Sequence, residues 1–143
     1  MVAISGKRNE IQIDVSRWPI IVSTGARGEI EDSEWLDYLT QYSELLKTHG
    51  EPYVAVVDLR DGGSLTAKQR KQLGEVMENG ERHPAAECLG QALVFNSALM
   101  RRLLTAVLWL AKPDYEIKVF TELEDAIKWG EQLVDEHRER KYA

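Results

Sequence analysis

The sequence predicts a single α/β domain, built on a mixed five-stranded sheet with an antiparallel N-terminal edge and about four helices. Two observations carry this prediction. Short apolar segments alternate with segments of helical periodicity, in the order β-β-α-β-α-β-α-β-α. No linker or repeat divides the 143 residues, a length typical of one domain. We expect one domain over residues 1–143, with a core at about 11–134 and a charged tail at 135–143.

The N-terminal third predicts a β-hairpin followed by a helix. Apolar and polar residues alternate over residues 11–15, and a second apolar segment begins at Ile20 after a turn. We expect the first of these two strands to be a sheet edge. Asp32 or Ser33 can cap the helix, which Gly50 ends. The predicted buried face of this helix comprises Trp35, Leu36, Leu39, Tyr42 and Leu46.

The middle of the chain predicts a fully buried strand and a solvated helix. Residues 54–57 are continuously apolar, as in a strand covered on both faces, and the strand ends at Asp58. Thr66 and Gln69 have the spacing of a capping box, which opens a helix over residues 66–79. This helix is expected to be the most solvated one, because its candidates for burial are few. They are Leu73, Val76 and Met77.

Two further strand–helix pairs complete the predicted domain. A strand at residues 90–96 leads to a helix that Ser97 caps and that runs to about Ala111. A strand at residues 116–121 leads to the last helix, where Thr121 and Glu124 have capping-box spacing. We expect this last helix to fray beyond His137, where the sequence becomes strongly charged.

Composition excludes several classes of protein. The net charge of −6 gives no global attraction to nucleic acid or anionic lipid. The single cysteine, Cys88, excludes an internal disulfide framework and fits a reducing cytoplasm. Residues 1–10 lack the apolar core of a signal peptide, and no window approaches the roughly 18 apolar residues of a membrane span. The three histidines lie in different elements without ligand spacing, so we predict no metal and no cofactor.

Several features together resemble the STAS superfamily and, within it, the SpoIIAA-like proteins, which are related to lipid-binding CRAL-TRIO folds. The features are a helix with Trp35, the Asp-Leu-Arg sequence at 58–60, the strand at 92–96, and the segment 119–129 with its strand-terminal Phe, acidic cap, Ala and Trp. The resemblance spans residues 11–134. It implies a bacterial, non-enzymatic signalling domain that acts through protein–protein interaction.

The resemblance also points to the junction after the middle strand. Classical STAS antagonists switch through a serine at this helix start, beside an aspartate. Here Asp61 and Ser64 are separated by two glycines, so the position matches but the Asp-Ser pair is absent. The candidate interaction residues, with a possible phosphorylation site at Ser64 or Thr66, are Asp58, Arg60, Asp61, Gly62, Gly63, Ser64 and Thr66.

Two interpretations of this junction remain open from the residues alone. It is either an ordinary capped turn, or a site that binds an acidic partner or accepts a phosphate. Three catalytic chemistries do not fit. A P-loop lysine is missing, the early strand lacks the acidic pair of a receiver domain, and the junction lacks the D-x-D motif of a dehalogenase-type phosphatase. No nucleophile has a visible base and orienting partner, so hydrolysis is also disfavoured.

The helix at residues 97–112 has an apolar arc of roughly 200°, wider than the 100° that packing on a sheet requires. The excess can be covered by a neighbouring helix, by a homodimer or other protein partner, or by a lipid or apolar ligand. The residues of this possible oligomer or ligand face are Met100, Leu104, Leu108, Trp109 and Ala111. A carrier or sensor of an apolar small molecule is therefore the alternative to a regulatory interaction domain.

Overall fold

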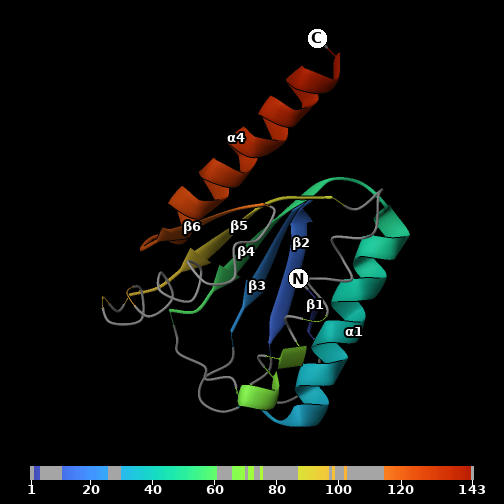
Figure 1. Cartoon of the computed structure of the whole chain (residues 1–143), viewed down its shortest axis with the longest axis vertical. Helices are drawn as coiled ribbons and strands as arrows, with labels where there is room; N and C mark the ends of the chain where they lie inside the picture. Colours follow the sequence, from blue (N-terminus) through green and yellow to red (C-terminus); the bar gives the residue numbers. More distant parts are fainter. Residues whose placement is uncertain are drawn as a thin grey trace.

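A mixed β-sheet of six strands forms the centre of the molecule (Figure 1). The computed structural model describes residues 2–3, 11–25, 30–60, 66–69, 71–72, 75, 87–96, 98, 102 and 115–142. Strands β1 to β3 pair antiparallel, and β3 to β6 pair parallel, in sequence order. The strands are β1 (Val2–Ala3), β2 (Gln12–Arg17), β3 (Ile20–Thr24), β4 (Tyr53–Asp58), β5 (Cys88–Val94) and β6 (Glu116–Phe120).

The N-terminal edge differs from the sequence-based expectation in one strand. We expected the strand at residues 11–15 to be the edge. Instead β1, only two residues long, pairs antiparallel with β2 and places Val2 opposite Ile13. Ile13 is fully buried, because β2 has a neighbour on each side and a helix above it. The predicted antiparallel edge is confirmed, and β1 extends it by one strand.

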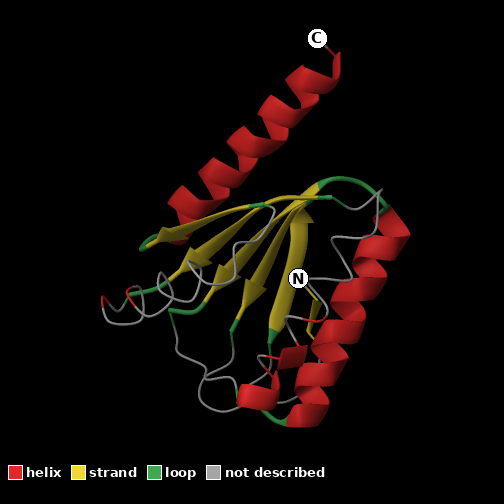
Figure 2. Cartoon of the chain, viewed as in Figure 1, coloured by secondary structure: helices red, strands yellow, loops and turns green. Residues whose placement is uncertain are grey.

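Two helices cover opposite faces of the sheet (Figure 2). Helix α1 (Asp32–His49) packs on one face, and α4 (Leu123–Tyr142) packs on the other. Strand β4 contributes to both cores: Tyr53 and Ala55 belong to the α1 core, whereas Val54 and Val56 belong to the α4 core. The uninterrupted apolar run of this strand is therefore explained, since successive side chains point to opposite faces and both faces are covered.

Helix α1 is anchored to the sheet by a row of aromatic rings. The ring centroids of Trp35 and Tyr38 are 5.5 Å apart, and those of Tyr38 and Tyr42 are 5.8 Å apart. Leu36, predicted to share this buried face, is 48% exposed, because the aromatic row lies on the next side of the helix. The predicted end of the helix is confirmed, since Gly50 adopts a left-handed conformation with φ 54°.

The starts of α1 and α4 were predicted inaccurately. Helix α1 is preceded by Glu31, without a side-chain capping bond, rather than by Asp32 or Ser33. In α4 the first turn is closed by the hydrogen bond from Ala126 N to Glu122 O. Glu122 therefore occupies the capping position that we assigned to Thr121. Acidic residues in the first turn of each helix interact favourably with the positive end of the helix dipole, and in α1 they compensate for the missing side-chain cap.

The C-terminal end of α4 extends past the sheet (Figure 1). We expected fraying beyond His137, but the helix continues to Tyr142. Its buried part packs closely on β5 at Gly90, where a Cβ atom would lie 2.6 Å from Leu133 Cδ1 and 2.9 Å from the Trp129 ring. Gly90 is thus required by the close approach of helix and strand.

The remaining two predicted helices fall largely outside the described residues. Residues 67–69 and 71–72 are helical, as predicted for the helix that begins near Thr66, and so are residues 98 and 102. Leu73, Val76 and Met77 lie outside the described residues. Among the described helices, none combines the length and the apolar character that crossing a bilayer demands.

Candidate interaction site at the end of strand β4

The carboxyl end of β4 is fixed by its neighbours and by an internal ion pair. Asp58 O accepts a hydrogen bond from Gly25 N at 2.9 Å, and Leu59 N donates to Val94 O at 2.9 Å. Asp58 is only 6% exposed, and its carboxylate accepts three hydrogen bonds from Arg60. Two come from the guanidinium, Nε to Oδ1 and Nη2 to Oδ2, each at 2.9 Å. This forked geometry is the strong form of a carboxylate–guanidinium pair.

The ion pair sets the charge state of Asp58. Burial alone would raise the pKa of this carboxyl, but the side-chain and backbone hydrogen bonds from Arg60 and the positive charge of its guanidinium outweigh burial. The pKa of Asp58 is therefore held below its ordinary value. A carboxylate that is ionised and already bonded on both oxygens is a poor general base or nucleophile. Asp58 thus serves to hold Arg60 and the strand end in place.

The helix that follows the junction begins with the capping box predicted from the sequence. Gln69 N donates to Thr66 Oγ1 at 3.1 Å, and Thr66 N donates to Gln69 Oε1 at 3.0 Å. Two amide donors that a helix start leaves unpaired are therefore satisfied reciprocally. The prediction of a box at Thr66 is confirmed.

Gln69 has a second role that sequence analysis missed. Its side chain is completely buried, and Nε2 donates to Ile30 O at 2.8 Å and to Asp32 Oδ1 at 3.0 Å. Gln69 therefore ties the start of this helix to the start of α1. Lys68 lies beside the same carboxylate, with Nζ 3.9 Å from Asp32 Oδ2. No local signal indicates this contact, because its partners are 37 to 39 residues away in the chain.

Hydrogen bonds between described residues therefore hold both ends of segment 61–65, and the segment itself lies outside the described residues. Asp58 and Arg60 stand on one side of it and Thr66 on the other. The candidate residues Asp61, Gly62, Gly63 and Ser64 lie outside the described residues. The second predicted face, formed by Met100, Leu104, Leu108, Trp109 and Ala111, also lies outside the described residues.

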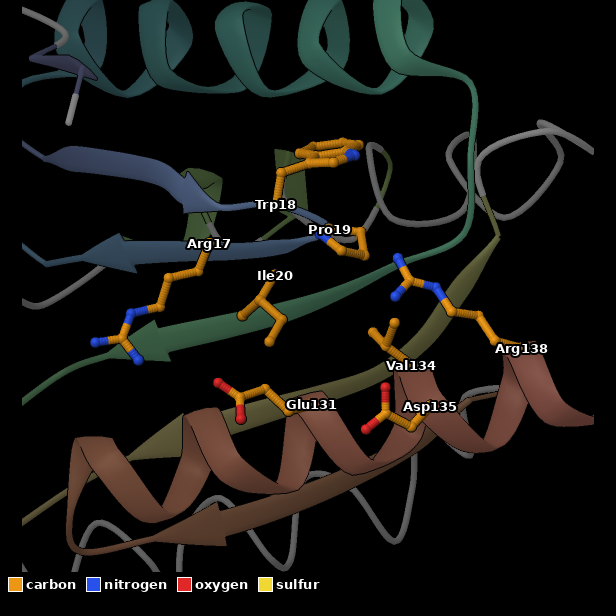
Figure 3. A pocket seen from close by; sticks show the side chains of 8 residues that line it. All are labelled: Arg17, Trp18, Pro19, Ile20, Glu131, Val134, Asp135 and Arg138. Carbon is orange, nitrogen blue, oxygen red and sulfur yellow. The ribbon is translucent and has the colours of Figure 1, made fainter.

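A shallow cleft of about 370 Å³ lies elsewhere, between the β2–β3 turn and α4 (Figure 3). Arg17, Trp18, Pro19 and Ile20 form one side, and α4 supplies the other. The residues of the α4 side are Glu131, Val134, Asp135 and Arg138. Because charges of both signs line the cleft, it is unsuited to a purely apolar ligand. Sequence analysis did not predict it, since its two sides are more than 100 residues apart in the chain.

The orientation of Trp18 at this cleft is fixed from the α1 side of the turn. Its ring stacks on His49 with centroids 4.0 Å apart, and Nε1 donates a hydrogen bond to Glu51 Oε1. Within the described part of the chain, no three His, Cys, Asp or Glu side chains cluster in a way that could hold a metal ion. The Trp18 ring points toward α1 and away from the α4 side of the cleft (Figure 3).

Comparison with known proteins identifies the fold. No protein-family model matches the chain, and no match was found among curated proteins. Among solved structures, the chain is similar to an uncharacterised protein of the DUF3478 family with a SpoIIAA-like fold, from Shewanella loihica PV-4. The TM-score is 0.64 at 20% sequence identity, and the match covers 88% of this chain and 98% of the other. The chain has a SpoIIAA-like fold, as the sequence resemblance predicted.

Proposed function

We propose that this chain is a non-enzymatic, cytoplasmic regulatory domain of bacterial type, which binds a protein partner through segment 61–65 and the residues around it. One observation carries the proposal. The partly buried pair of Asp58 and Arg60 holds the near end of the segment, and the bonds of Thr66 and Gln69 hold its far end. Fixing both ends of a short segment reduces the conformational entropy that binding would otherwise cost.

The charge state of the junction favours binding over catalysis. Proton transfer needs a group whose pKa lies near the working pH, but the pKa of Asp58 is shifted away from neutrality. Arg60, which remains about one-third exposed, can present positive charge to a partner while it holds Asp58. A partner with an acidic patch is therefore the chemistry that this end of the sheet suits best.

A phosphate on segment 61–65 would reverse the binding, and Ser64 is the better acceptor. The Thr66 hydroxyl oxygen accepts the capping bond from Gln69 N, so modification there would disturb the helix start. Ser64 precedes Thr66 by two residues, so its modification would leave the Thr66 capping oxygen unmodified. A phosphate on Ser64 would add about −1.5 to −2 charge units four residues after Arg60 in the chain and would repel an acidic partner.

The test combines phosphopeptide mapping with quantitative binding. The partner is first captured from the native host with the wild-type chain and then purified, so that affinities of variants can be measured. We expect Ser64→Ala to bind as wild type and Ser64→Glu to lose at least about tenfold in affinity. The matched controls are Thr121→Ala and Thr121→Glu, because Thr121 is an exposed hydroxyl residue that follows β6.

Two results would overturn the proposal. One is equal affinity of the Ser64 variants and the wild type, together with the absence of Ser64 phosphopeptides from the host, which would remove the switch. The other is unchanged partner binding after Arg60→Ala in a chain that remains folded, which would remove the docking surface. Native mass spectrometry of gently purified protein addresses the alternative, because a lipid-sized adduct would favour the carrier of an apolar molecule.

A further inference from the structure

Among the described residues, the outer edge of β6 is the longer of the two sheet edges. At the other edge, β1 has only two residues, whereas β6 has five. Phe95 N donates to Phe120 O, so the backbone polar groups of Phe120 face β5. Because backbone groups alternate along a strand, those of Ile117 and Val119 point away from β5. No described strand pairs with them, since β6 ends the strand order.

The side chains on this edge carry opposite charges in alternate positions. Glu116 and Lys118 are both exposed, and both lie on the α4 face of the sheet. Their direct neighbours on β5 are Gly90 and Ala92, which offer no charge. Neither residue forms an ion pair within the described part of the chain; Lys118 Nζ lies 5.5 Å from the Phe120 ring centroid.

This charge pattern is self-complementary rather than repulsive. Edge strands that resist self-association carry charges that oppose an approaching copy. Here an antiparallel copy centred on Ile117 places Glu116 opposite Lys118 of the second chain, and Lys118 opposite its Glu116. The registers centred on either neighbouring residue would instead place lysine against lysine or glutamate against glutamate. Of these three registers, the one centred on Ile117 forms two Glu116–Lys118 pairs without opposing like charges.

The apolar residues and the backbone agree with the same register. In this register Ile117 faces Ile117 of the second copy and Val119 faces Tyr115, and the Ile117 and Val119 side chains lie on the sheet face opposite α4. The backbone groups of Ile117 and Val119 point outward, so the two opposed Ile117 residues can exchange two hydrogen bonds. The charged pairs fall at the intervening positions, where opposed side chains are closest.

We propose that β6 pairs antiparallel with β6 of a second copy of this chain, in the register centred on Ile117, and so joins two six-stranded sheets into one. The edge is short, and the area it buries lies at the low end for specific interfaces, so the dimer is weak. We expect a dissociation constant between about 10 µM and 1 mM. This surface is separate from segment 61–65, and the inference does not rest on the proposed regulatory function.

Sedimentation velocity over a range of concentrations tests the dimer, with charge reversal as the probe. Glu116→Lys and Lys118→Glu each turn two attractive pairs into two repulsive ones, so each should raise the dissociation constant at least about tenfold. The double variant Glu116→Lys/Lys118→Glu restores both attractions and should dimerise as the wild type does. An equimolar mixture of the two single variants should also dimerise, because each supplies the charges that the other lacks.

The controls separate pairing from folding and from net charge. Both residues are exposed, so circular dichroism and thermal unfolding should show the variants folded. Lys128→Glu on the exposed side of α4 makes the same charge change as Lys118→Glu and should leave dimerisation unchanged. A wild-type chain that is monomeric throughout, or single variants that dimerise as the wild type does, would overturn the proposal. In the first case the edge would be free for a strand of another protein.

Discussion

Replacing Gln69 by glutamate is the sharpest single test of how the junction is held. The change keeps the shape of the side chain and keeps the oxygen that accepts from Thr66 N. It replaces the Nε2 donor by an oxygen that faces two acceptors, Ile30 O at 2.8 Å and Asp32 Oδ1 at 3.0 Å. Gln69→Glu therefore converts one buried and one partly buried hydrogen bond into two repulsive contacts.

The expected magnitude follows from these two contacts. Each lost hydrogen bond costs about 0.5–1.5 kcal/mol, and leaving Ile30 O unpaired next to a buried charge adds a desolvation cost. We expect Gln69→Glu to lower the free energy of unfolding by about 3 kcal/mol at neutral pH. That loss is a large part of the roughly 5–15 kcal/mol that stabilises a typical domain.

The loss should depend on pH in a defined direction. Burial and the nearby Asp32 carboxylate raise the pKa of the introduced carboxyl in the folded chain above its unfolded value of about 4.3. The destabilisation is therefore complete above the folded pKa and shrinks as the pH falls toward the unfolded value, where the protonated group can again donate to Ile30 O.

Urea unfolding, followed by tryptophan fluorescence and far-ultraviolet circular dichroism, measures these changes at neutral pH and at about pH 4. The matched control is Gln132→Glu, which makes the same chemical change at an exposed position of α4 and should stay within about 0.5 kcal/mol of wild type. If Gln69→Glu behaves like this control, the two bonds of Nε2 do not hold the helix start and the reasoning is refuted.

Two further predictions concern other polar contacts, the Asp58–Arg60 pair and the buried hydrogen bond from Tyr38 to Ser23. Arg60→Ala should cost about 1–3 kcal/mol at neutral pH because the Asp58 carboxylate loses its partner. The pKa of Asp58 is lowered in the fold, so the stability from this pair is present above the ordinary value of 3.8 and is lost as the pH falls through the folded pKa. The free energies of unfolding of the variant and the wild type should therefore converge in acid. Burial raises the pKa of Tyr38, although its bond to Ser23 partly opposes this, so stability should fall as the pH rises above 10.0. Tyr38→Phe should reduce this alkaline loss but not remove it, because burial also raises the pKa of Tyr42. The same unfolding assay should show a cost of about 1 kcal/mol at neutral pH.

Local sequence signals predicted the sheet and the ends of several elements. The continuous apolar run of β4 predicted burial on both faces, and each face is covered by a different helix. Gly50 and the Thr66 capping box were predicted because their causes lie within a few neighbouring residues. Signals of this kind need no knowledge of the tertiary structure.

The features that sequence analysis missed depend on contacts between distant segments. Leu36 was placed on the buried face by helical spacing, but which side of α1 faces the sheet is decided by the aromatic row of Trp35, Tyr38 and Tyr42. Gln69 belongs to a helix that we expected to be well solvated, and its burial is stabilised by partners in residues 30–32. Burial of a polar residue becomes predictable only when its hydrogen-bond partners are known.

The same distinction explains how far the candidate site could be predicted. The sequence located the junction because a strand end, two glycines and a capping box are local, whereas the bonds that make its ends rigid are partly non-local. Gln69 links the far end of segment 61–65 to the start of α1, and Asp58 links its near end to β3 and β5. A partner that binds this segment would therefore be coupled to α1, β3 and β5 at once. Because Gln69 and Arg60 hold opposite ends of the same segment, their variants should show non-additive effects on partner affinity, which a double-mutant cycle would measure.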